Sequence, residues 1–262
     1  MEYLATKIMD EKDKKKIFDT ILRAKYNGED TPKVWADVER VILGEPIDYV
    51  IGHVDFLGAR IDLSEKPLIP REETEYWTLK AINLIKNSTS SSERCYFLDL
   101  FSGSGCIGIA LLKHFPASQV DFVDSEGLCI RQIRRNIAIN SLLESRTRVY
   151  RNDVFPPTGG KYDYIFVNPP YIDKVSEDTV SKPVLDYEPR EALFAPDNGL
   201  FLIKKVIDGA GDFLSKGGTV FIEFGENQKE KIGAYVKKSG RFSEITFWKD
   251  QFDRDRVVVL KV

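Results

Sequence analysis

Histidine and cysteine are scarce in this chain of 262 residues. Its two histidines are His53 and His114, and none of its three cysteines forms a Cys-x-x-Cys pair. Because zinc sites are built mainly from grouped Cys and His ligands, we expect no metal site. Three scattered cysteines are typical of reduced thiols, which indicates a cytoplasmic protein. The Gly-x-Ser-x-Gly turn of many Ser-His-Asp hydrolases is also missing, so that class of enzyme is not indicated.

Long apolar runs and a strong net charge are lacking as well. No run reaches the roughly 18 apolar residues of a membrane helix, and Met1–Leu4 does not begin a signal peptide, so we expect no membrane association. The net charge is −3, with 41 acidic and 38 basic residues. A chain with this balance and no basic, aromatic-rich arm is not expected to bind nucleic acid directly. Its length suits one α/β domain with a small accessory part, and we expect a monomer.

Three segments are predicted along the chain. Residues 1–43 are charged and helical, with a helix start at Thr31-Pro32. Residues 44–92 are expected to hold a β-hairpin over Val50–Leu63 and a connecting helix, followed by a Ser-rich linker at its end. From residue 93 to residue 262, strands alternate with helices, which predicts an α/β domain with a mostly parallel sheet.

The most informative motif is Asn168-Pro169-Pro170-Tyr171, which follows the strand-like run Tyr164–Val167. The two prolines restrict the backbone, so the Asn168 side-chain oxygen and the Pro169 carbonyl can point at the same place. Two acceptors in that arrangement suit a planar –NH₂ group, which has two N–H donors. Tyr171 adds an aromatic wall. A proline turn that ends a strand is the alternative reading of the same residues.

A glycine-containing loop lies upstream. The strand-like run Cys95–Leu100 leads into Phe101-Ser102-Gly103-Ser104-Gly105, and a helical run follows from Cys106. Glycines between a strand and a helix let the backbone approach a ligand beside the helix N-terminus. A tight turn without a ligand explains this pattern equally well.

Two acidic residues follow later strands. Asp124 ends the run Val120–Asp124, about twenty residues after the loop, where an acid accepts hydrogen bonds from ribose hydroxyls. Its alternative is to cap the next helix. Asp153 follows the strand Thr147–Tyr150 and is placed to accept from an adenine amino group, although the pair Asn152-Asp153 also suits a turn.

The order of these motifs resembles the class I S-adenosylmethionine-dependent methyltransferases. This resemblance implies a Rossmann-like, mostly parallel seven-stranded sheet, to which the sequence adds a small helical N-terminal domain and a β-hairpin linker. It also implies S-adenosyl-L-methionine as cofactor and S-adenosyl-L-homocysteine as product. The loop Phe101-Ser102-Gly103-Ser104-Gly105, with Asp124, Asp153 and Asn168, would hold the cofactor.

Further segments narrow the resemblance to the glutamine methyltransferases of peptide chain release factors. They are Glu45–Ile47, Leu68–Glu75, Asp186–Leu193, Asp197–Gly199 and Ile222–Gly225. The family implies methyl transfer to the side-chain amide of the glutamine in a Gly-Gly-Gln tripeptide. Carried over, Asn168, Pro169 and Tyr171 would be catalytic, and these three with Pro170 would bind the substrate side chain. Residues 1–43 would be the docking domain for the release factor.

Two departures from the family pattern stand out. Phe101 occupies the place of the first glycine of the usual loop, which is costly if the backbone there needs a positive φ. The helical segment of about 43 residues is shorter than the family's usual N-terminal domain. Three alternatives stay open: a glutamine methyltransferase for a ribosomal protein, an amino methyltransferase for adenine or cytosine in nucleic acid, and a non-catalytic cofactor-binding protein.

Overall fold

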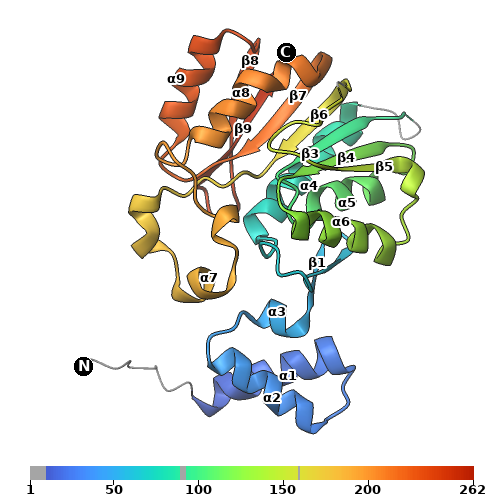
Figure 1. Cartoon of the computed structure of the whole chain (residues 1–262), viewed down its shortest axis with the longest axis vertical. Coiled ribbons are helices and arrows are strands. Elements are labelled where there is room, and N and C mark those ends of the chain that lie inside the picture. Colours follow the sequence, from blue (N-terminus) through green and yellow to red (C-terminus); the bar gives the residue numbers. More distant parts are fainter. Residues whose placement is uncertain (1–9, 89–92, 159) are drawn as a thin grey trace.

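The computed structural model describes residues 10–88, 93–158 and 160–262. A helical N-terminal unit, a small β-hairpin and a large α/β domain follow one another along the chain (Figure 1). The first nine residues of the predicted helical segment lie outside the described part, as do residues 89–92 of the predicted linker.

The N-terminal unit is built from three helices around a core of its own. The helices are α1 (Glu11–Tyr26), α2 (Pro32–Ile42) and α3 (Ile47–Ile51). The buried side chains of this core are Ile21, Val34, Val38 and Val50. Helix α2 begins at Pro32, as predicted, because proline suits the first turn of a helix, where no backbone N–H is needed.

The hairpin connects this unit to the α/β domain. Strands β1 (His53–Phe56) and β2 (Ala59–Asp62) pair antiparallel around Leu57 and Gly58, which both have positive φ. The predicted start of the hairpin at Val50 is wrong, because Val50 and Ile51 belong to α3, which ends at the left-handed Gly52. Helix α4 (Glu72–Ser88) follows the hairpin and packs against the large sheet of the α/β domain.

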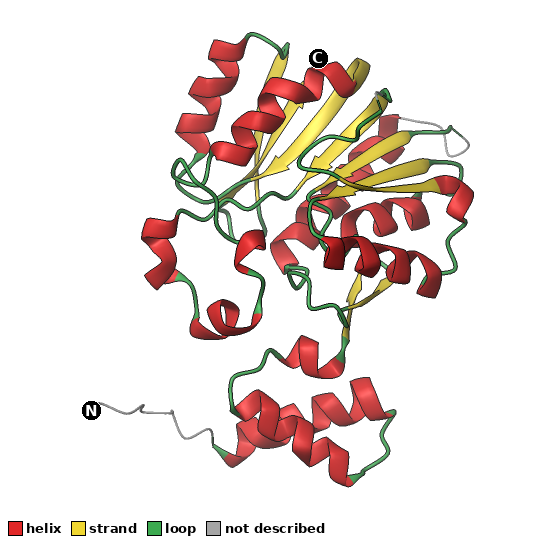
Figure 2. Cartoon of the chain, viewed as in Figure 1, coloured by secondary structure: helices red, strands yellow, loops and turns green. Residues whose placement is uncertain are grey.

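The α/β domain is centred on a seven-stranded sheet with the order β5-β4-β3-β6-β7-β9-β8 (Figure 2). Its strands are β3 (Tyr96–Leu100), β4 (Gln119–Asp124), β5 (Thr147–Arg151), β6 (Tyr162–Val167), β7 (Leu214–Glu223), β8 (Glu244–Lys249) and β9 (Asp255–Lys261). Strands β3 to β7 run parallel, and β9 pairs antiparallel with both β7 and β8. The predicted mostly parallel seven-stranded sheet is confirmed.

Helices cover both faces of the sheet. Helices α4, α5 (Cys106–His114) and α6 (Gly127–Ile139) contribute to one buried core, and α8 (Phe201–Phe213) and α9 (Lys229–Ser239) contribute to the other. Between β6 and α8, the chain forms a long connection that contains α7 (Lys182–Tyr187) and short 3-10 turns. None of the helices described is long and apolar enough to cross a membrane.

Candidate active site

The predicted site residues follow the carboxyl ends of adjacent parallel strands. The chain proceeds from β3 to β4 and β5 on one side, and then returns to place β6 on the other side of β3. Ligands of open α/β sheets bind in the crevice that such a reversal creates. The loop after β3, Asp124 at the end of β4 and Asn168 just after β6 therefore converge at one edge.

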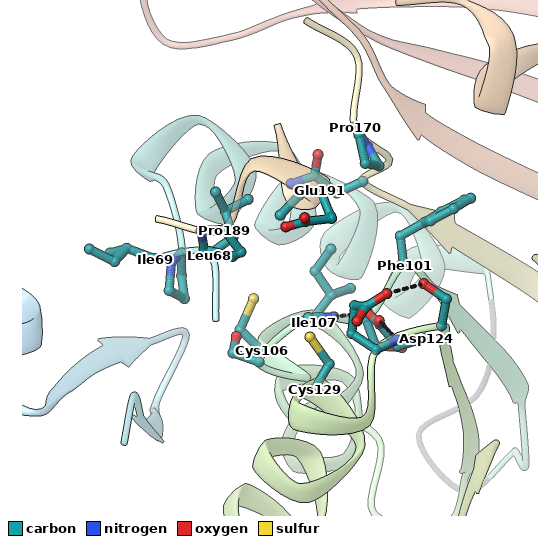
Figure 3. Close-up of a pocket in the computed structure, with 18 of the residues that line it drawn as sticks. Leu68, Ile69, Phe101, Cys106, Ile107, Asp124, Cys129, Pro170, Pro189 and Glu191 are labelled. Carbon is teal, nitrogen blue, oxygen red and sulfur yellow. Dashed lines mark hydrogen bonds between the residues drawn. The ribbon is translucent and has the colours of Figure 1, made fainter. Parts of the chain in front are cut away.

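A pocket opens at this edge (Figure 3). One side of it carries Phe101 and Asp124, and the other carries Leu68, Ile69 and Pro189. Of the residues predicted to hold the cofactor, those that line the pocket are Phe101, Ser102, Gly103, Ser104, Asp124, Asp153 and Asn168. Gly105 is not among the lining residues.

Gly105 instead supports the loop from below. It is the left-handed N-cap of α5, with φ of +80°, and an added Cβ would lie 3.2 Å from the side chain of Ile133. Its amide donates to the carbonyl of Ser102 at 2.7 Å. Gly105 therefore closes the turn that leads into α5, rather than forming a surface of the pocket.

Phe101 adopts a conformation that favours glycine. Its φ is +55°, in the left-handed region, where a bulky side chain is a rare outlier. The ring lines the pocket and packs on the core cluster that contains Leu100 and Val123. The residue that departs from the family pattern is therefore strained and also forms part of the pocket wall.

The Asp124 carboxylate accepts hydrogen bonds from two backbone amides. One carboxylate oxygen accepts from the Gly103 amide at 2.8 Å, and the other accepts from the Glu126 amide at 2.9 Å. Burial raises the pKa of Asp124 above its usual range, and these two hydrogen bonds oppose that rise. Since each carboxylate oxygen can accept more than one hydrogen bond, Asp124 keeps acceptor capacity toward the pocket.

Asp153 lies at the rim of the pocket. Its carboxylate forms an ion pair with Lys205 of α8 at 2.7 Å, and its side chain is 71% exposed. The structure therefore places it near the other predicted cofactor residues, but the ion pair already uses one of its oxygens.

Asn168 and Pro169 present two acceptors without partners in the described parts of the chain. The Asn168 side-chain nitrogen donates to the hydroxyl of Thr74 at 3.2 Å, which leaves its oxygen Oδ1 on the other side. Neither this Oδ1 atom nor the carbonyl of Pro169 accepts a hydrogen bond from a described residue. The pair is thus available to a planar –NH₂ group, as the motif predicts.

Tyr171 faces a second cleft. This cleft is also lined by Asn168, Pro169 and Glu223, and it lies next to the first pocket, because Asn168 lines both. The Tyr171 hydroxyl donates to buried Glu223 at 3.0 Å. Of the four motif residues, Pro170 faces the first pocket, and Pro169 and Tyr171 face the second.

The wall opposite the glycine loop was not predicted from the sequence. Buried Glu188 accepts from the Ile69 amide at 3.0 Å and from Arg71 at 2.6 Å. This contact joins the segment before α4 to the connection after β6, so that Pro189 closes the pocket. The sequence marks both segments only as motifs that resemble a family. They are separated by more than one hundred residues, and nothing in either segment indicates that they are in contact.

The first pocket fits an adenosine-bearing sulfonium compound. Its lining is largely apolar, with Ile69, Ile107 and Leu128, and it also carries the carboxylate of Asp124. An apolar slot beside a carboxylate suits a purine ring joined to a ribose. Residues 10–88, 93–158 and 160–262 contain no group of three or more side chains that could hold a metal ion.

Comparisons with known proteins find methyltransferases. Residues 82–186 match the family model described as Methyltransferase small domain. A release factor glutamine methyltransferase of Streptococcus pneumoniae is 33% identical over 82% of this chain and 75% of its own. A methyltransferase of Streptomyces pristinaespiralis for 4-amino-L-phenylalanine and 4-methylamino-L-phenylalanine is 31% identical over 81% of this chain and 72% of its own.

The fold has counterparts among solved structures. A methyltransferase from Pyrococcus furiosus superposes with a TM-score of 0.57 at 18% identity, over 85% of this chain and 96% of that one. At this identity the likeness concerns the fold.

Proposed function

The chain belongs to the release factor glutamine methyltransferases, and we propose that it methylates a glutamine side chain of a peptide chain release factor. The methyl donor is S-adenosyl-L-methionine, and the acceptor is the amide nitrogen of the glutamine in a Gly-Gly-Gln tripeptide. The observation that carries this proposal is a pair of acceptors beside the apolar pocket, Asn168 Oδ1 and Pro169 O, to which no described residue donates.

The first pocket is proposed to hold the donor. Asp124 would accept from the ribose hydroxyls and Asp153 from the adenine amino group, while Phe101 and the loop Ser102–Ser104, supported by Gly105, would surround the remainder. When bound, S-adenosylmethionine supplies a methyl group whose carbon–sulfur bond breaks with its electron pair left on sulfur.

The chain's own contribution at the acceptor is placement. An amide nitrogen is a weak nucleophile because its lone pair is delocalised into the carbonyl. The acceptors on Asn168 and Pro169 would hold both amide hydrogens and so fix the direction of the nitrogen. The same acceptors favour the positive charge that develops on nitrogen as it bonds to the methyl carbon. One N–H proton then leaves to water, so no strong base is required.

The second cleft is proposed to hold the peptide around the glutamine. It is open and carries both apolar and charged side chains, among them Val180, Val184, Arg71 and Arg254. Tyr171 would form the wall against which the glutamine side chain packs. The first pocket and this cleft meet at Asn168, so donor and acceptor would approach that residue from opposite sides.

The N-terminal helical unit is proposed to dock the release factor. It has its own core and stands apart from the sheet in Figure 1. Two of its larger apolar side chains are exposed, Trp35 at 53% and Leu43 at 80%. In keeping with a translation substrate, we propose that the protein acts in the cytoplasm.

Methyl transfer from labelled S-adenosylmethionine tests the proposal. The acceptors are a purified release factor, the same factor with the glutamine changed to glutamate, total ribosomal protein, single-stranded DNA and RNA, and 4-amino-L-phenylalanine. We expect label on the unmodified release factor alone. Label on ribosomal protein, nucleic acid or the aromatic amine, with none on the release factor, would overturn the assignment of the substrate.

A further inference from the structure

A chain of hydrogen bonds runs from the amide of Asn168 into the core. Asn168 Nδ2 donates to Thr74 Oγ1 at 3.2 Å, and Thr74 Oγ1 donates to Glu223 Oε2 at 2.7 Å. Thr74 is 1% exposed and Glu223 is 2% exposed. Asn168 lies in the turn after β6, Thr74 in the first part of α4, and Glu223 at the end of β7. These hydrogen bonds therefore join elements that are far apart in the sequence.

The carboxylate fixes the direction of each bond. The ring N–H of Trp77 can only donate, so Glu223 Oε2 is an acceptor, and the Thr74 hydroxyl gives its single hydrogen to that same oxygen. The lone pairs of that hydroxyl are then left to accept from Asn168, and only the –NH₂ end of the Asn168 amide can donate. The Asn168 oxygen must consequently face away from Thr74, which is the orientation that the proposed reaction needs.

Glu223 is held in place from two further sides. Trp77 of α4 donates its ring N–H to the same oxygen, Oε2, at 2.6 Å, and Tyr171 donates to the other oxygen, Oε1. Trp77 is fully buried and stacks on Phe166 of β6, with ring centres 5.9 Å apart. Glu223 is therefore held rigidly. It is hydrogen-bonded directly to Tyr171 of the Asn-Pro-Pro-Tyr motif, and Thr74 links it to Asn168.

We propose that Thr74 and Glu223 are positioning residues that set the amide orientation of Asn168. Without them, the Asn168 amide is free to rotate by half a turn and present –NH₂ in place of oxygen to the substrate. Two donors would then face each other, and the substrate amide would lose one of its two acceptors. This inference rests on the proposed function for its catalytic consequence, but the orientation itself belongs to the protein alone.

Thr74→Val removes the hydroxyl at nearly constant volume, and Thr74→Ser keeps it. Thr78→Val is a matched control, because Thr78 is one turn further along α4, is equally buried, and has a hydroxyl without a hydrogen-bond partner in the described structure. We expect Thr74→Val to lower kcat roughly tenfold or more with little change in KM or cofactor affinity. Thr74→Ser should restore most of kcat, and Thr78→Val should leave it unchanged.

A second readout does not depend on the substrate. Hydrogen exchange of the Asn168 side-chain amide is followed by ¹⁵N NMR, with Asn168→Asp to assign the signal. We expect slow exchange in the wild type, Thr74→Ser and Thr78→Val, and faster exchange in Thr74→Val. Equal exchange and equal kcat in Thr74→Val and Thr78→Val would overturn the proposal.

The two readouts separate the two proposals. If the wild type methylates no release factor but Asn168 exchange responds to Thr74→Val, the positioning role stands and the substrate assignment fails. If the release factor is methylated and Thr74→Val behaves like Thr78→Val, the substrate assignment stands and the positioning role fails.

Discussion

Gly199 leaves no room for a side chain beside the carbonyl oxygen of Tyr171. A Cβ added to Gly199 would be 1.9 Å from that oxygen, closer than any van der Waals contact. Gln228 donates its side-chain amide to the same carbonyl at 2.9 Å, and to the carbonyl of Asn198 at 2.9 Å. The backbone that follows the Asn-Pro-Pro-Tyr motif thus packs against Gly199, a position where no side chain fits.

Gly199→Ala should therefore damage the active site. The methyl group must push the Tyr171 backbone away, and a shift of that size next to Asn168 should lower kcat roughly a hundredfold. Gly217→Ala is the matched control, because Gly217 has nearly the same φ, +76° against +77°, and nothing within 4 Å of an added Cβ. Both variants should lose about 1 kcal/mol of stability to backbone strain. Equal activity of the two variants would show that the contact with Tyr171 is unimportant.

Phe101 is predicted to contribute its ring rather than its backbone. Phe101→Gly relieves a left-handed conformation that costs roughly 1–2 kcal/mol, but it removes part of the pocket wall. We expect weaker binding of S-adenosylmethionine by calorimetry. Phe101→Ala separates the two effects, because alanine keeps the steric cost of a positive φ but lacks the ring. Tighter binding by both variants would mean that the ring obstructs the pocket instead.

Asp99 should make stability depend on pH. Burial raises the pKa of this carboxyl, at the end of β3, to about 8, and a hydrogen bond from the Gly108 amide lowers it only partly. The folded protein therefore keeps a proton that the unfolded chain loses above about pH 4. Because the folded state binds more protons in that window, this group lowers the free energy of unfolding as the pH rises from about 4 to 8.

Asp99→Asn cannot titrate but can still accept from Gly108. The free energy of unfolding of Asp99→Asn minus that of the wild type should be larger at pH 8 than at pH 5, by at least about 1 kcal/mol. Urea unfolding at the two pH values measures this difference. A constant difference between variant and wild type would contradict a protonated Asp99.

Asn168→Ala should separate catalysis from cofactor binding. It removes one of the two acceptors proposed to hold the substrate amide, so turnover should fall roughly a hundredfold or more. The apolar walls and Asp124 remain, and the affinity for S-adenosylmethionine should be nearly unchanged by calorimetry. Equal losses of turnover and affinity would instead assign Asn168 to the donor pocket or to the fold.

The sequence predicts best those features that depend on the order of strands, helices and motifs along the chain. Alternating strands and helices predicted the parallel sheet, and each proposed cofactor segment lies at the end of its strand or just after it. The carboxyl ends of parallel strands share one edge, so the convergence of Asp124 with Asn168 follows from the fold class. The hairpin start was misplaced because Val50 and Ile51 suit a strand by composition, while packing in the N-terminal core keeps them helical.

Contacts between distant segments could not be predicted. Thr74 and Glu223 are 149 residues apart, and Glu188 reaches Ile69 across 119 residues. Nothing in the local pattern of either segment indicates its partner, because the contact depends on how α4 and the connection after β6 pack on the finished sheet. Glu223 illustrates the point, since a glutamate at the end of a strand would ordinarily be expected at the surface.

Tandem mass spectrometry can show whether a glutamine amide nitrogen is the methyl acceptor. A purified release factor is incubated with the protein and S-adenosylmethionine, digested, and its Gly-Gly-Gln peptide is fragmented. We expect one added methyl group located on the glutamine side chain, and none with Asn168→Ala. Calorimetry first shows that the methyltransferase binds S-adenosylmethionine. If the Gly-Gly-Gln peptide of the release factor then stays unmodified, methylation of its glutamine is contradicted.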